Sequence, residues 1–192
     1  MNMIRVLFDL LFKTIIVGDP NVGKTSITIR FATGTFKERY LPTIGVEFSV
    51  KDIEIDKRTV KLQLWDTGSH DRFSYVRPLY YRGSFGVLVV YDITNQESFN
   101  NVEKWFEEVY SNCDGEIIPA IMIGNKVDMV DERVISKEEA IEKAKILAQK
   151  YSLDSIPYYE VSAKNGQLIN EIYYDLTRLM IKKSEELEAT RS

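Results

Sequence analysis

The sequence contains little cysteine and no long hydrophobic run. Cys113 is the only cysteine among the 192 residues, so the chain cannot form an internal disulfide and is compatible with a reducing compartment. No apolar stretch reaches the roughly 20 residues that a membrane-spanning helix needs. Residues 1–12 are apolar, but Arg5 and Asp9 interrupt them and no small-residue cleavage site follows. We therefore expect a cytoplasmic protein with residues 1–11 packed on it as an extension; a segment that touches a membrane is the alternative.

The chain also lacks an excess of positive charge. It has 25 basic and 29 acidic residues, which gives a formal net charge of −4. Proteins that bind nucleic acid usually carry a basic surface, so no nucleic-acid partner is expected. Repeats and low-complexity segments are absent too, and 44 % hydrophobic residues are enough to build one core. We therefore expect a single folded domain.

Apolar strands and amphipathic helices alternate along the chain and predict an α/β domain. Strands are expected at about Thr14–Val17, Val46–Ile55, Val60–Trp65, Phe85–Asp92, Ala120–Gly124 and Tyr158–Val161. Helices are expected at about 25–33, Gln96–Tyr110, 137–151 and Leu168–Met180. The second and third strands form an antiparallel hairpin through the turn Asp56–Thr59. The expected fold has three layers, with helices on both faces of a mostly parallel six-stranded sheet that contains one antiparallel strand.

Two of the predicted helices have a clear apolar side. The first is expected to bury Phe99, Val102, Trp105, Phe106 and Val109. The second starts at a capping box of Ser136 and Glu139 and is expected to bury Ala140, Ala144, Ile146, Leu147 and Ala148. The polar stretch Thr67–Gly83 has no clean period and contains Pro78, which indicates a functional loop with room for a short helix. In such a sheet the ligand lies at the carboxyl ends of the strands.

The segment Gly18–Thr25 matches the pattern G-x-x-x-x-G-K-[ST]. It follows an apolar, β-branched run and opens a helix, which is the context that a phosphate-binding loop requires. Its glycines let backbone N–H groups converge on phosphate oxygens, Lys24 supplies a cation, and the Thr25 hydroxyl can ligate Mg²⁺. A strand-to-helix turn that merely contains glycines is the alternative. The predicted phosphate-binding residues are Asp19, Pro20, Asn21, Val22, Gly23, Lys24, Thr25 and Ser26.

Three further signals follow predicted strands. Asp66 comes at the end of the strand Val60–Trp65, where a carboxylate can hold Mg²⁺ through water. Asn125-Lys126-Val127-Asp128 follows the strand Ala120–Gly124, and Ser162-Ala163-Lys164 follows the last strand. All three are expected at the same edge of the sheet as the phosphate-binding loop.

Together these motifs resemble those of Ras-superfamily small GTPases, and most closely those of the Rab family. Thr43-Ile44-Gly45-Val46-Glu47-Phe48 resembles the first switch of the family. Leu64-Trp65-Asp66-Thr67 resembles the start of the second switch, and Tyr80-Tyr81-Arg82-Gly83 the Rab segment beyond it. The resemblance implies a P-loop NTPase fold, with a small G domain over residues 12–181 and a tail over 182–192.

The resemblance also implies how the nucleotide is held. By the family pattern, Asp128 accepts hydrogen bonds from guanine that adenine does not offer, and Asn125 bridges the base and the loop. Thr43 would bind Mg²⁺ and sense the γ-phosphate, so that hydrolysis releases its loop. The remaining implied base contacts are Phe36, Lys126, Ser162, Ala163 and Lys164.

Partner binding is implied by the same resemblance. Phe48, Trp65 and Tyr80 match the aromatic triad that Rab effectors read in the GTP state; ordinary packing on the hairpin face is the alternative. An exchange factor and a GTPase-activating protein are further expected partners at the switch loops. No cysteine follows Cys113, whereas Rab proteins usually end in prenylated cysteines. Attachment to endomembranes is therefore expected only if a prenylated tail exists beyond this sequence.

The second switch departs from the family pattern D-T-A-G-Q-E-R-F. This chain has Ser69 where the family has a glycine near the γ-phosphate, and His70 where it has the glutamine that orients the attacking water. An imidazole donates and accepts from opposite sides of a ring, unlike a carboxamide, so we expect slow hydrolysis. A solvated surface histidine is the alternative for His70.

The function expected is a switch that binds GTP or GDP with Mg²⁺, hydrolyses GTP with help from Lys24 and Thr43, and regulates membrane trafficking. A module that holds the nucleotide with little turnover is the first alternative, because of Ser69 and His70. An ATP-dependent kinase is disfavoured by the segment Asn125–Asp128.

Overall fold

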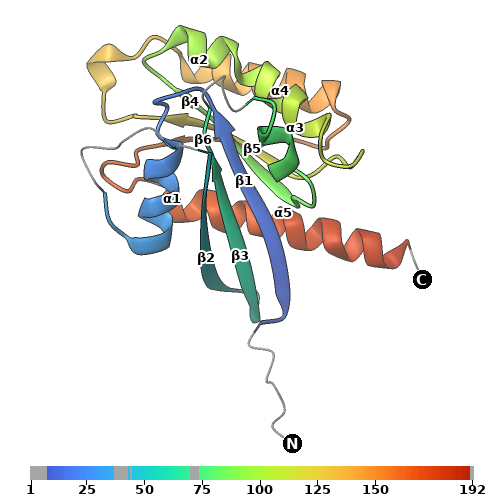
Figure 1. Cartoon of the computed structure of the whole chain (residues 1–192). Helices are drawn as coiled ribbons and strands as arrows, with labels where there is room; N and C mark the ends of the chain where they lie inside the picture. The colour runs from blue at the N-terminus through green and yellow to red at the C-terminus, as the bar shows by residue number, and fades with distance from the viewer. Residues whose placement is uncertain (1–7, 37–42, 44, 70–73, 191–192) are drawn as a thin grey trace, which may run out of the picture.

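A central sheet organises the fold. The computed structural model describes residues 8–36, 43, 45–69 and 74–190, and within them the strands lie in the order β2-β3-β1-β4-β5-β6 (Figure 1). β2 pairs antiparallel with β3, and every other pairing is parallel. The predicted mostly parallel, six-stranded sheet is therefore confirmed. The strands are β1 (Leu10–Gly18), β2 (Val46–Ile55), β3 (Arg58–Thr67), β4 (Gly86–Asp92), β5 (Ala120–Asn125) and β6 (Tyr158–Val161).

Helices cover both faces of the sheet (Figure 1). α1 (Lys24–Thr33) and α5 (Ile169–Ala189) pack on one face, where Phe31 stacks on Tyr173 with ring centroids 3.9 Å apart. The other face carries α2 (Gln96–Asn100), α3 (Val102–Tyr110) and α4 (Lys137–Lys150). The central strand β4 is buried along its whole length because helices cover both of its sides. The three predicted layers are thus present.

The hairpin between β2 and β3 turns more tightly than predicted. Its loop consists of Asp56 and Lys57, with φ angles of 50° and 64°. Positive φ at both central residues is typical of the two-residue turn that matches the twist of an antiparallel pair. Arg58 and Thr59, expected in the turn, pair with β2 instead.

The helices on the α2–α4 side of the sheet differ from the predictions in two places. The predicted helix Gln96–Tyr110 is interrupted at Asn101, which separates α2 from α3. Ile146 was predicted to be buried, but its side chain is 56 % exposed. It lies two positions after the buried Ala144, and about 100° of rotation per residue places it on the opposite side of the helix. The capping box of Ser136 and Glu139 is confirmed.

The last helix is longer than its apolar pattern predicts. α5 continues past Met180 to Ala189, so most of the predicted tail 182–192 is helical. Its final turns consist mainly of Lys and Glu, which favour helices without contributing to an apolar stripe. Arg58 anchors this part of α5 to the hairpin through an ion pair of 2.7 Å with Glu185. None of the helices in the described part of the chain is long and apolar enough to cross a membrane.

Thr67–Gly83, the stretch for which no period was found, contains a short 3-10 helix among its described residues. This is η2 (Arg77–Tyr80), in line with the prediction of a short helix. The amino-terminal extension lies largely outside the described residues. Of its described part, Phe8 lies beside Lys61, whose Nζ is 5.3 Å from the ring centroid, and the Asp9 N–H donates to the Thr59 carbonyl at 2.8 Å.

Candidate nucleotide-binding site

The predicted site residues lie at one edge of the sheet. β1, β3, β4 and β5 all run in the same direction, and their carboxyl ends deliver Gly18, Asp66, Asp92 and Asn125 to that edge. β6 ends next to Asn125 and leads into Ser162. Motifs that are far apart in the sequence are thereby brought together, as expected for a ligand site of this fold.

The phosphate-binding loop requires glycine at Gly23. Its φ is 98°, and an added Cβ would lie 2.3 Å from the amide nitrogen of Asn125. Pro20 and Asn21 are exposed at the tip of the loop, whereas Val22 is buried beneath it. Ser26 is half-buried in the first turn of α1. The loop is therefore packed directly against the segment predicted to bind the base.

Lys24 lies inside the loop with its ammonium hydrogen-bonded to backbone carbonyls. Its side chain is buried, and Nζ donates to the carbonyls of Gly18 at 2.9 Å and Asp19 at 2.8 Å. Burial lowers the pKa of Lys24 to about 8, although the carboxylates of Asp66 and Asp19 oppose this shift. A buried ammonium gains most from an anion that replaces its lost hydration, so this position favours a phosphate.

Two hydroxyls converge on a buried carboxylate beside Lys24. Thr25 Oγ1 lies 2.8 Å from Thr43 Oγ1, and both hydroxyls hydrogen-bond to Asp66 Oδ2, Thr43 at 3.4 Å. The other carboxylate oxygen, Oδ1, is buried and has no hydrogen-bond partner among the described residues. Burial also raises the pKa of Asp66. Oxygen ligands of this kind fit Mg²⁺, which keeps several waters and takes few protein ligands. The described residues contain no cluster of three His, Cys, Asp or Glu that would suit another metal.

Asn125 links three segments of the site. It is buried; its amide donates to the Val22 carbonyl at 2.8 Å, and its oxygen accepts from the Ala163 N–H at 3.2 Å. Beside it, Ser162 Oγ donates to Asp128 Oδ1 at 2.6 Å, which orients that exposed carboxylate. Lys126 pairs with Asp92 at 2.6 Å. The predicted base-binding residues therefore form one connected network with the phosphate-binding loop.

Arg30 of α1 is part of this network and was missed by the sequence analysis. Its guanidinium donates to the Ala163 carbonyl at 3.0 Å, to the Lys164 carbonyl, and to the Gly34 carbonyl at 2.9 Å. It also lies 5.9 Å from the ring centroid of Phe36. Lys164 itself is exposed. Arg30 thus ties the loop after β6 to the end of α1, where a helical pattern alone gave no signal.

The second switch approaches the first switch closely at Gly68. Its N–H donates to the Gly45 carbonyl at 2.7 Å, and an added Cβ would lie 2.7 Å from the Thr43 carbonyl oxygen. Next to it, Ser69 Oγ accepts a hydrogen bond of 3.1 Å from Lys24 Nζ. Ser69 therefore contacts the cation of the phosphate-binding loop directly. His70 lies outside the described residues.

The three aromatic residues predicted to contact effectors form a continuous row. The rings of Phe48 and Trp65 meet edge to face at 5.1 Å, and Tyr80 lies 6.2 Å from Trp65. Phe48 is 52 % exposed, while Trp65 is half-buried over Lys13, whose Nζ is 4.4 Å from the ring centroid. Packing on the hairpin and an exposed aromatic surface therefore occur together.

α3 also reaches the phosphate-binding loop, through contacts that the sequence did not indicate. Trp105 Nε1 donates to Asp19 Oδ1 at 2.7 Å, and Asn101 Nδ2 donates to Asp19 Oδ2 at 2.8 Å. Trp105 was predicted only as a buried apolar residue. One feature of the sequence could have indicated a polar contact here: the indole N–H of a buried tryptophan usually has a hydrogen-bond partner.

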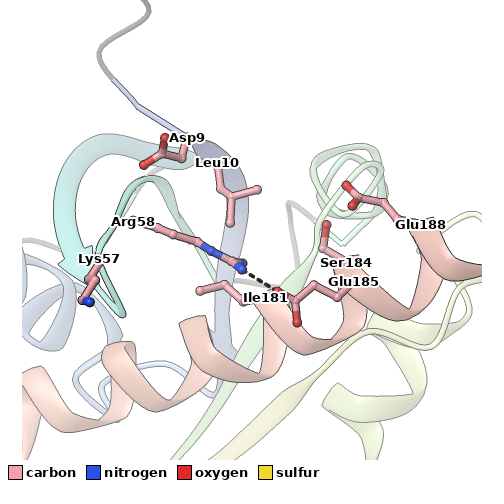
Figure 2. Close-up of a pocket in the computed structure, with 8 residues that line it drawn as sticks. All are labelled: Asp9, Leu10, Lys57, Arg58, Ile181, Ser184, Glu185 and Glu188. Carbon is pink, nitrogen blue, oxygen red and sulfur yellow. Dashed lines mark ion pairs between the residues drawn. The ribbon is translucent and has the colours of Figure 1, made fainter.

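A separate pocket lies at the opposite end of the sheet. It has a volume of about 330 Å³ and lies between the start of β1, the β2–β3 turn and the last turns of α5 (Figure 2). Acidic and basic side chains both line it, including the ion pair of Arg58 and Glu185. None of the predicted site residues that the structure describes lines this pocket, so it is distinct from the candidate site.

Comparisons with known proteins agree with the motifs and the fold. A Ras family profile matches residues 13–182. The chain is 40 % identical over 171 residues to the GTP-binding protein ypt1 of Schizosaccharomyces pombe, covering 89 % of this chain and 80 % of that protein. It is 38 % identical over 181 residues to the Ras-related protein Rab-10 of Caenorhabditis elegans, covering 94 % and 86 % respectively. The chain therefore belongs to the Ras family and, within it, to the Rab small GTPases, enzymes that hydrolyse GTP to GDP and phosphate.

Proposed function

We propose that this chain is a Mg²⁺-dependent GTP/GDP switch of membrane trafficking whose own hydrolysis of GTP is slow. The observation that carries the proposal is the convergence of the Thr25 and Thr43 hydroxyls on the buried Asp66, beside the ammonium of Lys24. Guanine would be held by the network around Asn125 and Asp128. Residues 12–181 would form the complete nucleotide-binding unit.

Mg²⁺, when bound, would neutralise charge on the phosphate oxygens, held by Thr25, Thr43 and, through water, Asp66. The unpartnered Oδ1 of Asp66 supports this assignment because a buried carboxylate oxygen without a partner is costly. Thr43 belongs to the segment before β2, so its hydroxyl would tie that segment to the nucleotide. Loss of the γ-phosphate would release this tie and change the surface offered to partners.

In hydrolysis, water attacks the γ-phosphorus in line with the leaving oxygen, and the protein contributes mainly position and charge. Lys24 would stabilise charge on the phosphates, since its ammonium is already desolvated and aligned by two carbonyls. Ser69 competes for the same ammonium at 3.1 Å. A hydroxyl that takes one of three lysine donors reduces what is left for the phosphate, which supports slow turnover.

Single-turnover hydrolysis of GTP by the full chain tests this part of the proposal. The wild type is compared with Ser69→Gly, His70→Gln and the double variant, which together restore the family pattern at both positions. We expect each single change to accelerate hydrolysis and the double variant to be fastest. Equal rates in all four proteins would contradict the roles given to residues 69 and 70.

The second candidate function is a module that holds GTP or GDP without useful turnover. The contact between Ser69 and Lys24 favours it, because that contact draws the loop cation away from the γ-phosphate. Multiple-turnover hydrolysis with a GTPase-activating protein separates the two candidates. A rate that stays at the background of the buffer, in the presence of the activator, would establish the binding module.

Base specificity and partners are separate parts of the proposal. Competition of ADP and GDP for the loaded protein tests the guanine assignment; equal competition would contradict it. We also propose that exchange factors, activating proteins and effectors bind at the switch segments, with Phe48, Trp65 and Tyr80 as the aromatic contacts of effectors. Phe48→Ala removes an exposed ring and is expected to weaken effector capture while leaving GDP binding unchanged.

A further inference from the structure

The carboxylate of Asp19 fastens the phosphate-binding loop to α3. Both of its oxygens are used: Oδ1 accepts from the indole N–H of Trp105 at 2.7 Å, and Oδ2 accepts from the amide of Asn101 at 2.8 Å. Hydrogen bonds to a charged acceptor are roughly twice as strong as those between neutral groups. Asp19 also presents its carbonyl to Lys24 at 2.8 Å. One residue therefore connects the ammonium of the loop to α3.

The interruption between α2 and α3 explains why these two donors reach the loop. Asn101 is the residue at the break, and Trp105 follows it by one helical turn, so both side chains lie on the same side of α3. Trp105 is only 3 % exposed. If the buried indole N–H lost Asp19, no water could replace the acceptor, so breaking this hydrogen bond is costly.

The face of the Trp105 ring contacts Arg77, in the second switch segment. The guanidinium carbon of Arg77 lies 4.7 Å from the centroid of the indole ring. Arg77 is buried at the start of η2 and is fixed by two hydrogen bonds to Glu108 of α3, at 2.6 and 2.8 Å. Tyr81, just after η2, donates to the same carboxylate at 2.8 Å. A displacement of η2 that moves Arg77 therefore acts directly on Trp105.

We propose that Trp105 is a positioning residue for nucleotide retention. Its N–H keeps the phosphate-binding loop in place through the hydrogen bond to Asp19. Because Arg77 packs on the indole ring, the position of Trp105, and with it this hydrogen bond, depends on the position of η2. The inference rests on the proposed binding of guanine nucleotide to this loop.

The decisive variant is Trp105→Phe in the full chain. Phenylalanine keeps an aromatic ring beneath Arg77 but removes the N–H that binds Asp19. Tyr110→Phe is the matched control, because it also removes one buried donor from α3, the hydroxyl that binds the Ile118 carbonyl at 3.1 Å, away from the loop. Both variants lose one hydrogen bond in the core, and only one of them touches the loop.

The rate of release of a fluorescent GDP analogue is measured after a chase with unlabelled GDP, together with unfolding in urea. We expect Trp105→Phe to release the analogue about tenfold faster than the wild type, the effect of one lost charge-assisted hydrogen bond. Tyr110→Phe is expected to release it at the wild-type rate. The single-turnover rate of GTP hydrolysis should change by less than about twofold in Tyr110→Phe, because its hydroxyl does not contact the loop.

The contribution of Arg77 is measured by a double-mutant cycle. Arg77→Gln is expected to accelerate GDP release in the wild-type background but to add little in the Trp105→Phe background, because its effect passes through the indole N–H. Equal effects in the two backgrounds would overturn this coupling.

The failure of the inference is distinguishable from the failure of the proposed function. If the wild type does not bind the GDP analogue, the nucleotide site itself is wrong. If the wild type binds it and Trp105→Phe releases it no faster, the positioning role is overturned. The same conclusion follows if Tyr110→Phe accelerates release as much, since general destabilisation would then explain both variants.

Discussion

Arg77 and Glu108 form an ion pair, and we expect replacement of Glu108 to lower the free energy of unfolding more than replacement of Arg77. The Arg77 side chain is 4 % exposed, and its Nη1 is already buried without a partner among the described residues. The Glu108 side chain is 18 % exposed, so it is less completely shielded from water than Arg77. Breaking a buried pair costs about 3–5 kcal/mol because an uncompensated charge remains. Glu108→Ala leaves the buried guanidinium and the Tyr81 hydroxyl without their acceptor, and we expect this full cost.

Arg77→Met is expected to cost less. It leaves the carboxylate of Glu108, which water can solvate, and it fills the space over Trp105 with an apolar chain of similar length. We expect a loss of about 1–2 kcal/mol, in the range of a hydrogen bond to a charged group. Since total stability is roughly 5–15 kcal/mol, the two variants should be well separated in a denaturant titration. In thermal unfolding, Glu108→Ala should lower the midpoint by about 6–20 °C.

The assay is urea unfolding of the wild type, Glu108→Ala, Glu108→Gln and Arg77→Met, followed by circular dichroism at fixed nucleotide concentration. Glu108→Gln serves as the control, because it keeps an acceptor for both Tyr81 and Arg77 and should lie between the wild type and Glu108→Ala. Finding Arg77→Met to be as destabilising as Glu108→Ala, or more so, would refute the argument from unequal access to water.

Three further predictions concern other positions. Gly68→Ala should weaken Mg²⁺-dependent binding of a GTP analogue by about tenfold, because a Cβ would lie 2.7 Å from the Thr43 carbonyl and overpacking costs about 1–3 kcal/mol; an unchanged Mg²⁺ titration would contradict this. Burial lowers the pKa of Lys24 to about 8. Since phosphate favours the charged form, calorimetry should give constant GDP affinity well below that pH and falling affinity above it, by up to about tenfold per pH unit; a flat profile to pH 9.5 would rule the mechanism out. Cys113 is 3 % exposed and burial raises the pKa of its thiol to about 11, so iodoacetamide at pH 8 should label it at least about 100-fold more slowly in the native protein than in urea; fast native labelling, seen by mass spectrometry, would show that the site opens.

The sequence predicted the candidate site well because parallel strands share an edge. Thr25 and Asp66 lie in separate segments, yet each was placed by the helix or strand next to it, whereas Thr43 was placed by the resemblance to the family. The structure brings the oxygens of all three together. The roles of these residues remain a prediction. The convergence of Thr25 and Asp66 required only the order of apolar runs and the rule that such strands run in the same direction.

What the sequence did not predict are polar contacts between distant segments. Periodicity identified Trp105 as buried, but it carries no information on where an indole N–H points, and Asp19 is 86 residues away. Arg30 was likewise invisible, since its contacts with the loop after β6 span 133 residues. Ile146 shows the opposite error: an apolar residue near an apolar stripe was counted as core although its position in the turn faces solvent.

The long last helix has a consequence for how the chain reaches its native state. α5 supplies Ile169, Ile172, Tyr173, Leu176, Met180 and Ile181 to the core on the α1 side of the sheet. α1 covers part of that face, but the contacts of α5 form only after the last part of the described chain has been synthesised. Strands whose apolar face is incompletely covered are prone to associate with other chains. We therefore expect the growing chain to be most prone to aggregation just before α5 is complete.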